Sequence, residues 1–189
     1  DHLRATVLPD LQAAARTRPV RIWSAGCSTG EEVYSIAMCL LGPDAGSAAW
    51  LRGGNVKLLA TDLAPHVVEA TQRGVYAAAT AEPVPAAYRK TWMHTRGDEV
   101  VMDDAARSLV SARVLNLFAP WPMRRQFDVI FCRNVVIYFD DATQERVWKR
   151  FTPLMTPGAT LYIGHSERVS GSAVNQLTPA GLTTYRLAP

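Results

Sequence analysis

Small and polar residues follow a short apolar run near the start of the chain. Gly26 and Gly30 flank Ser28 and Thr29 directly after the β-prone segment 20–23. Because glycine carries no side chain, such a loop lets a ligand approach the backbone closely, as in nucleotide and nucleoside sites. An ordinary turn capped by one of the two hydroxyls explains the loop equally well, so the loop alone favours neither interpretation.

Two carboxylates follow this loop. Glu31 and Glu32 fall in the first turn of a helix predicted over 31–41, where the helix dipole favours negative charge. The dipole therefore accounts for both residues without a ligand. A carboxylate at this position repels a pyrophosphate, however, so a ligand with an ammonium or sulfonium group fits the loop better.

An acidic residue ends the second apolar run. Asp62 follows the segment 56–61, and Pro65 begins the helix predicted over 65–73. An acidic side chain at the end of this strand suits bidentate hydrogen bonding to a ribose diol. The alternative is that Asp62 caps the helix. One side chain can hardly fill both roles, and the sequence leaves the choice open.

Two further polar pairs stand at the ends of later apolar runs. Asn116 and Leu117 follow the segment 112–115, and Arg133 and Asn134 follow the strongly apolar segment 127–132. An amide, an apolar wall and a second polar pair suit an adenine and an aminoacyl tail. Each residue alone is more often a turn or cap residue, but four such positions in succession indicate a binding site.

The elements that position these residues alternate between strand and helix. A helix is predicted over 3–16, before the first strand. A later helix over 142–153 precedes the fifth strand, which is predicted over 160–163. Two β-like segments, 173–177 and 182–187, are expected to close the sheet as a hairpin. Such alternation predicts a mostly parallel α/β sheet with helices on both faces, where ligands bind beyond the carboxyl ends of the strands.

Residues 80–111 interrupt this alternation. The stretch holds two prolines and then two β-like segments, 92–94 and 99–102, around Arg96-Gly97-Asp98. These features indicate a hairpin. We therefore predict a small inserted β subdomain over 80–111 within one catalytic domain over 1–189.

Composition narrows the function classes. The chain has 189 residues, 48% of them hydrophobic, and a net charge of +3 carried by scattered basic residues. Nucleic-acid binding gains little support from that distribution, although attraction to an acidic protein surface stays open. The absence of a long apolar run predicts a cytoplasmic protein without direct membrane insertion. Three cysteines without a paired short spacing indicate reduced thiols.

Several motifs together resemble the CheR-type chemotaxis methyltransferases. They are the loop and helix start over 21–37, the segment 60–62, the stretch 127–139 that runs from Phe-Asp-Val-Ile-Phe-Cys-Arg-Asn to Ile-Tyr-Phe, and Gly164-His165-Ser166-Glu167. The motifs occur in the family's order and span essentially the whole chain. The resemblance implies a Rossmann-like class I S-adenosylmethionine-dependent methyltransferase fold with a mostly parallel, seven-stranded sheet.

The resemblance also implies roles for individual residues. Glu32 would bind the amino group of S-adenosylmethionine and Asp62 its ribose hydroxyls, while the loop at Gly26 lies against the ligand. The rest of the cofactor would contact Asn116, Leu117, Arg133 and Asn134. Tyr138 would face the transferring methyl group as the catalytic residue; the alternative is that it is an aromatic plug in the core.

The implied activity is protein-glutamate O-methylation. The acceptors would be the cytoplasmic domains of chemoreceptors, and the protein, which we expect to be a monomer, would associate with chemoreceptor arrays and leave S-adenosylhomocysteine as product. Transfer to a carboxylate that is already ionised at neutral pH, with a reference pKa of about 4.3, needs no general base. Alignment and partial desolvation would then be the work of the site.

Three departures from the family pattern bear on function. We expect that the family's upstream helical domain, which places an aromatic-aromatic-Arg motif against the methyl donor, is absent from this chain. Val33 stands where the family usually has proline. The predicted hairpin loop 95–99 has one glycine and two adjacent carboxylates, whereas members that bind a receptor's C-terminal pentapeptide have several glycines there. We therefore expect no pentapeptide binding.

Other classes of protein fit the sequence less well. A dinucleotide-dependent oxidoreductase needs closely spaced glycines and an acid about 20 residues on, but Asp62 lies 36 positions after Gly26. A nucleic-acid methyltransferase would need a basic face and a base-flipping pocket. A module that binds S-adenosylmethionine or S-adenosylhomocysteine for regulation, or a methyltransferase with another substrate, stays open.

Overall fold

A central seven-stranded sheet organises the chain. The computed structural model describes residues 1–188, and its main sheet has the order β6-β2-β1-β7-β8-β10-β9. The five parallel strands are β1 (Val20–Ala25), β2 (Val56–Asp62), β6 (Val110–Val114), β7 (Phe127–Cys132) and β8 (Met155–Ile163). The antiparallel strands β10 (Thr184–Leu187) and β9 (Leu177–Gly181) complete one edge. The predicted mostly parallel α/β sheet is confirmed.

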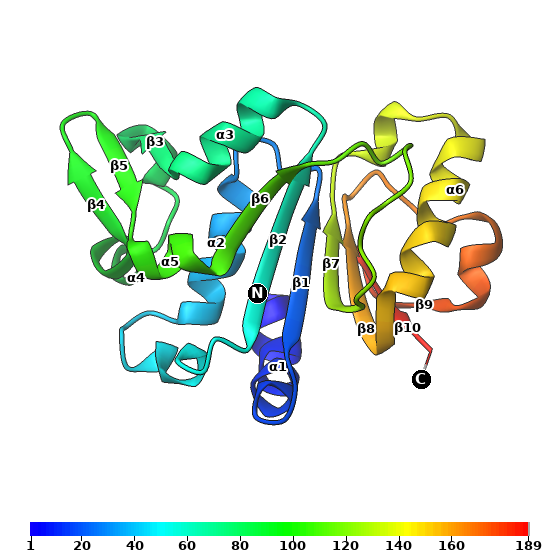
Figure 1. Cartoon of the computed structure of the whole chain (residues 1–189), viewed down its shortest axis with the longest axis horizontal. Coiled ribbons are helices and arrows are strands. Elements are labelled where there is room, and N and C mark those ends of the chain that lie inside the picture. Colours follow the sequence, from blue (N-terminus) through cyan, green and yellow to red (C-terminus); the bar gives the residue numbers. More distant parts are fainter. Residues whose placement is uncertain (189) are drawn as a thin grey trace.

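Helices cover both faces of this sheet (Figure 1). They are α1 (Leu8–Ala15), α2 (Glu31–Leu41), α3 (Pro65–Arg73), α5 (Asp104–Leu109) and α6 (Asp141–Phe151), with a π-helical turn over Leu3–Val7 before α1. Neighbouring residues of one strand enter different cores: Ile22 packs with α1 and α2, whereas Trp23 packs with α6. Strands buried on both faces explain why the sequence shows continuous apolar runs.

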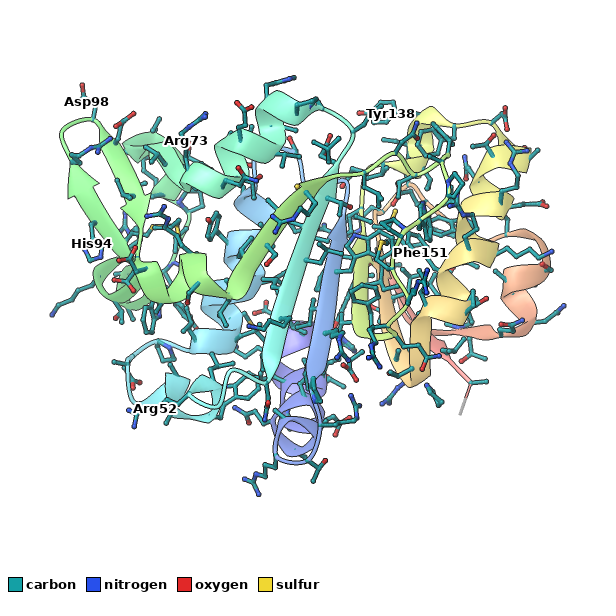
Figure 2. The ribbon with its side chains drawn as sticks, in the orientation of Figure 1. Arg52, Arg73, His94, Asp98, Tyr138 and Phe151 are labelled. Carbon is teal, nitrogen blue, oxygen red and sulfur yellow. The ribbon has the colours of Figure 1, made fainter. Side chains whose placement is uncertain are left out.

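An aromatic cluster fills the core beneath α6. The Trp23 ring lies 5.1 Å from that of Trp121, 5.3 Å from that of Phe127 and 5.2 Å from that of Phe151, measured between centroids. Trp23 Nε1 donates to Thr61 Oγ1 at 2.9 Å, so its one polar group is satisfied. Figure 2 shows Phe151 between α6 and the sheet. This cluster fixes α6 and the long loop after β6 on the sheet.

A second, three-stranded sheet lies at one end of the molecule (Figure 1). Its strands are β3 (Val75–Ala77), β5 (Glu99–Met102) and β4 (Met93–Arg96), with the 3-10 helix η3 (Ala78–Ala81) and α4 (Ala86–Trp92) between β3 and β4. The β4–β5 hairpin turns at Gly97, which has a φ of +61°. The sheet starts before residue 80 because β3 pairs with β5, and Val110 and Ser111 belong to β6 of the main sheet.

The C-terminal hairpin differs from its predicted boundaries. The segment 173–177 was expected to be β-like, but Gly171–Asn175 form the 3-10 helix η6 and the strand starts at Leu177. Gly171 has a φ of +65°, and Ala173 is buried in the core under α6. The apolar residues there therefore pack against a helix, and a short apolar run does not distinguish the two structures.

None of the helices between residues 1 and 188 combines the length and the apolar character needed to cross a bilayer.

Candidate functional site

A hollow of about 390 Å³ opens beyond the carboxyl ends of β1, β2, β6 and β7. The strand order reverses between β1 and β7, so the hollow lies at the switch point where open α/β sheets bind ligands. Six of the eight residues to which the family resemblance gives a role line it: Gly26, Asp62, Asn116, Leu117, Asn134 and Tyr138. The other lining residues are Ser28, Leu63, Leu115, Phe118, Val135 and Phe139.

Two side-chain hydroxyls form hydrogen bonds with the backbone of the glycine loop after β1. Thr71 of α3 donates its hydroxyl to the carbonyl oxygen of Ser28 at 3.1 Å, and Tyr76 of β3 donates to that of Thr29 at 3.0 Å. Gly26 has a φ of +79°, and a Cβ at this position would overlap the Val135 side chain. The glycine is therefore required by its backbone conformation and by its packing against Val135, which lies in the loop after β7 (the β7 loop).

Asp62 bridges two loops at the edge of the hollow. Its Oδ2 accepts the Ser28 N–H at 2.9 Å and its Oδ1 accepts the Ala64 N–H at 3.2 Å. Ala64 is the N-cap of α3, which has no side-chain cap, so Asp62 does not cap that helix. A carboxylate has about four acceptor positions. Two backbone bonds therefore leave capacity for a diol in the hollow.

Asn116 and Leu117 form the opposite wall. Asn116 Oδ1 accepts the Phe118 N–H at 2.8 Å, which closes a tight turn, while Leu117 is buried in the core beneath α6. The exposed Phe118 ring contacts Phe139 edge to face at 4.8 Å. A flat apolar ligand therefore meets an aliphatic and aromatic surface here, with an amide at its margin.

Arg150 of α6 holds this wall in place, a role for which the sequence carried no local signal. Its Nη1 donates to the Leu117 carbonyl oxygen at 2.6 Å and its Nη2 donates to that of Ala119 at 2.5 Å. The guanidinium lies 4.0 Å from the centroid of the Trp121 ring. Burial lowers the pKa of Arg150 from its usual value.

The loop after β7 is built around a buried carboxylate. Asn134 has a φ of +58°, an uncommon conformation for a residue with a side chain. Glu167 accepts backbone N–H groups from Asn134, Val135 and Val136. The family motif includes Glu167, but no role for this residue could be inferred from the sequence.

Glu32 and Arg133 pair with each other beside the hollow and do not line it. Arg133 Nη1 lies 3.1 Å from Glu32 Oε2, and Ser24 Oγ donates to Glu32 Oε1 at 3.0 Å. Both carboxylate oxygens of Glu32 thus have internal partners. A ligand amino group at this point would share the carboxylate with Arg133.

Tyr138 stands at the mouth of the site. It ends the 3-10 helix η4 (Val136–Tyr138), and its side chain is 80% exposed, so Tyr138 is not a plug in the core. Figure 2 shows Tyr138 at the edge of the molecule to which β1 points. Leu63 and Phe118 are exposed apolar residues of the same hollow.

The chemistry open to this site is ligand binding and alignment. Residues 1–188 contain no group of three or more His, Cys, Asp or Glu side chains arranged to hold a metal ion. Burial raises the pKa of Cys27 to about 11, and burial also raises the pKa of Cys132 well above its usual value, so neither is a ready thiolate nucleophile. A carboxylate, an amide and an apolar wall fit an adenosine moiety.

Fold and site together define an α/β domain of the S-adenosylmethionine-binding methyltransferase class. The model of the family described as "CheR methyltransferase, SAM binding domain" matches residues 1–186. The chain therefore belongs to the CheR methyltransferase family, of which it contains the S-adenosylmethionine-binding domain.

Known chemotaxis proteins are similar along most of the chain. A probable chemotaxis protein methyltransferase of Rhizobium etli is 45% identical over 98% of this chain and 70% of its own length. The chemotaxis protein methyltransferase of Klebsiella aerogenes is 42% identical over 86% of the chain and 57% of its own length. The chemotaxis protein methyltransferase of Salmonella typhimurium is 35% identical over 95% of the chain and 63% of its own length. The chain thus spans between 57% and 70% of the length of these relatives.

Proposed function

We propose that this chain is the catalytic domain of a protein-glutamate O-methyltransferase that modifies the cytoplasmic domains of chemoreceptors. One observation carries the proposal: the hollow is lined by the residues that the CheR motifs place at the strand ends, among them Asp62, Asn134 and Tyr138. The relatives' names support a role in chemotaxis, but they do not state the methylated group.

The assignment of residues to S-adenosylmethionine follows the walls of the hollow. Asp62 would accept hydrogen bonds from the ribose hydroxyls, and Leu117 would contact the adenine with Asn116 at its edge. The backbone at Gly26 and Asn134 would lie against the aminoacyl part. Its ammonium would bind Glu32. Because Glu32 already forms an ion pair with Arg133, part of its negative charge would already be neutralised.

The chain's own contribution to the reaction is alignment. S-adenosylmethionine, when bound, supplies a methyl group on a positively charged sulfur. A glutamate acceptor is ionised at neutral pH, so transfer to it needs no general base. The exposed Tyr138 would donate a hydrogen bond from its hydroxyl to an arriving carboxylate, and the apolar surfaces of Phe118 and Leu63 would displace water from that carboxylate.

The small sheet bears on how receptors are recognised. Because β5 lies between β3 and β4, the strand edge open to an added peptide beside the hairpin is that of β4. Arg96 at its end pairs with Glu99 at 3.0 Å, and Asp98 stands at the hairpin tip (Figure 2). A negatively charged tip disfavours a peptide's terminal carboxylate. We therefore infer that receptors are recognised without a C-terminal pentapeptide.

The decisive experiment measures transfer of radiolabelled methyl groups to purified receptor cytoplasmic domains by the full-length protein. Labelled receptor that loses its label in mild base, as a methyl ester does, supports the proposal. Tyr138→Phe should lower the rate with little change in S-adenosylhomocysteine affinity, and Tyr185→Phe on β10, outside the hollow, is the matched control. Binding of S-adenosylhomocysteine without any transfer would instead identify a regulatory module.

A further inference from the structure

The Glu167 side chain is a buried carboxylate surrounded by backbone donors. It is 2% exposed, and none of the ion pairs between residues 1 and 188 includes it. Its Oε1 accepts the N–H groups of Val135 at 2.9 Å and Val136 at 3.0 Å. Its Oε2 accepts those of Asn134 at 3.1 Å and Gly164 at 2.5 Å. Four backbone dipoles thus stabilise a charge that has no cationic partner.

These four bonds join the ends of two neighbouring strands. Asn134 to Val136 follow β7, and Gly164 follows β8. A Cβ at Gly164 would lie 2.9 Å from the Asn134 nitrogen and 2.9 Å from Glu167 Oε2, so the carboxylate is packed without spare room. The left-handed conformation of Asn134 is maintained within this set of bonds.

The same loop forms one side of the hollow. Asn134, Val135 and Tyr138 line it, whereas Glu167 does not. The Val135 side chain also occupies the space where Gly26 lacks a Cβ, which brings the β7 loop against the glycine loop. A shift of the backbone at 134–136 would therefore move two sides of the site together.

We propose that Glu167 is a positioning residue for the methyl donor, acting through the backbone of the β7 loop and not by contact with the ligand. This inference rests on the proposed function, because it requires the donor to bind in the hollow. A carboxylate suits the role because it accepts on both oxygens. Glutamine has the same shape but would direct its NH₂ group at two of the four N–H donors.

Two variants separate a positioning role from a contribution to stability alone. In Glu167→Gln, two backbone donors lose their acceptor. In the matched control Leu11→Ala, a side chain of α1 that is 4% exposed is shortened in the core on the other face of the sheet. Both variants should melt below the unmodified protein. S-adenosylhomocysteine is titrated calorimetrically into each full-length protein well below both melting temperatures.

We expect Glu167→Gln to weaken S-adenosylhomocysteine binding by about 10- to 100-fold, the consequence of unpaired buried donors in a loop that lines the site. Leu11→Ala should bind as the unmodified protein does. Equal affinity in Glu167→Gln, or an equal loss in Leu11→Ala, would overturn the inference. If the unmodified protein does not bind S-adenosylhomocysteine, the proposed function fails instead.

Hydrogen exchange gives a test that needs no variant. In the unmodified, ligand-free protein the amides of Asn134, Val135, Val136 and Gly164 should exchange as slowly as those of β7, although all four lie outside strands. Exchange at the rate of exposed loop amides would overturn the inference even if Glu167→Gln did not fold.

Discussion

Replacement of Asp62 tests how the ribose is bound. In Asp62→Ala the ligand would lose the acceptor for its diol, and the N–H groups of Ser28 and Ala64 would lose theirs. Ser28 is exposed, so water can replace the carboxylate at its amide, and the direct loss to the ligand should dominate. Because the hollow is open to solvent, we expect a loss of about 1–3 kcal/mol in binding, or roughly 5- to 150-fold in affinity.

The assay compares two ligands in two proteins by calorimetry. S-adenosylhomocysteine and its 2′,3′-dideoxy analogue are each titrated into the unmodified protein and into Asp62→Ala, with Asp98→Ala at the distant hairpin tip as control. If Asp62 binds the diol, removal of the hydroxyls weakens binding to the unmodified protein but hardly changes binding to Asp62→Ala. A mutant that loses as much affinity for the dideoxy analogue would show that Asp62 acts only on the glycine loop. Unchanged affinity for both ligands would refute the assignment.

Three further predictions concern the surroundings of the site. Gly26→Ala should lower the free energy of unfolding by at least about 1–2 kcal/mol, because alanine is strained at a φ of +79° and its methyl group would overlap Val135; urea denaturation measures this, and an unchanged midpoint contradicts it. Arg150→Lys should weaken S-adenosylhomocysteine binding while keeping the charge, because a lysine cannot donate in parallel to the Leu117 and Ala119 carbonyls; equal affinity would show that the charge suffices. Burial raises the pKa of the Cys27 thiol from 9.0 to about 11, so the native state favours the neutral thiol, and its contribution to stability should be lost as the pH rises through 9 to about 11. Cys27→Ser should show a smaller loss across that range, and an identical loss in both proteins would contradict the prediction.

Local sequence signals predicted the main sheet well. Pro65 and Arg73 bound α3 as expected, because a proline suits the first helical turn and Gly74, with a φ of +60°, ends the helix. The strands of the parallel sheet were visible because burial on both faces demands unbroken apolar runs. The residues after those strands then meet at one edge for topological reasons alone.

Features that depend on distant contacts were not visible in the sequence. The bonds from Glu167 to the β7 loop span more than 30 residues, and those from Arg150 to the Leu117 and Ala119 carbonyls span a similar distance. A glutamate or an arginine in the sequence does not by itself indicate such a role. The start of the small sheet was missed for the same reason, because Val75–Ala77 is recognisable as a strand only through its pairing with Glu99–Val101.

The hydrogen bond from Tyr76 to the Thr29 carbonyl limits how this protein can be recombined with its relatives. Tyr76 belongs to β3 of the small sheet, yet it supports the glycine loop, and Met102 at the end of β5 is buried against the main core with its N–H on the Gly74 carbonyl. The segment that forms the small sheet can therefore not be exchanged as one unit. A chimaera that imports another hairpin should exchange residues only within 93–99, which contain β4 and the β4–β5 turn. Junctions at Val75 and Met102 would remove contacts that support the glycine loop and the main core.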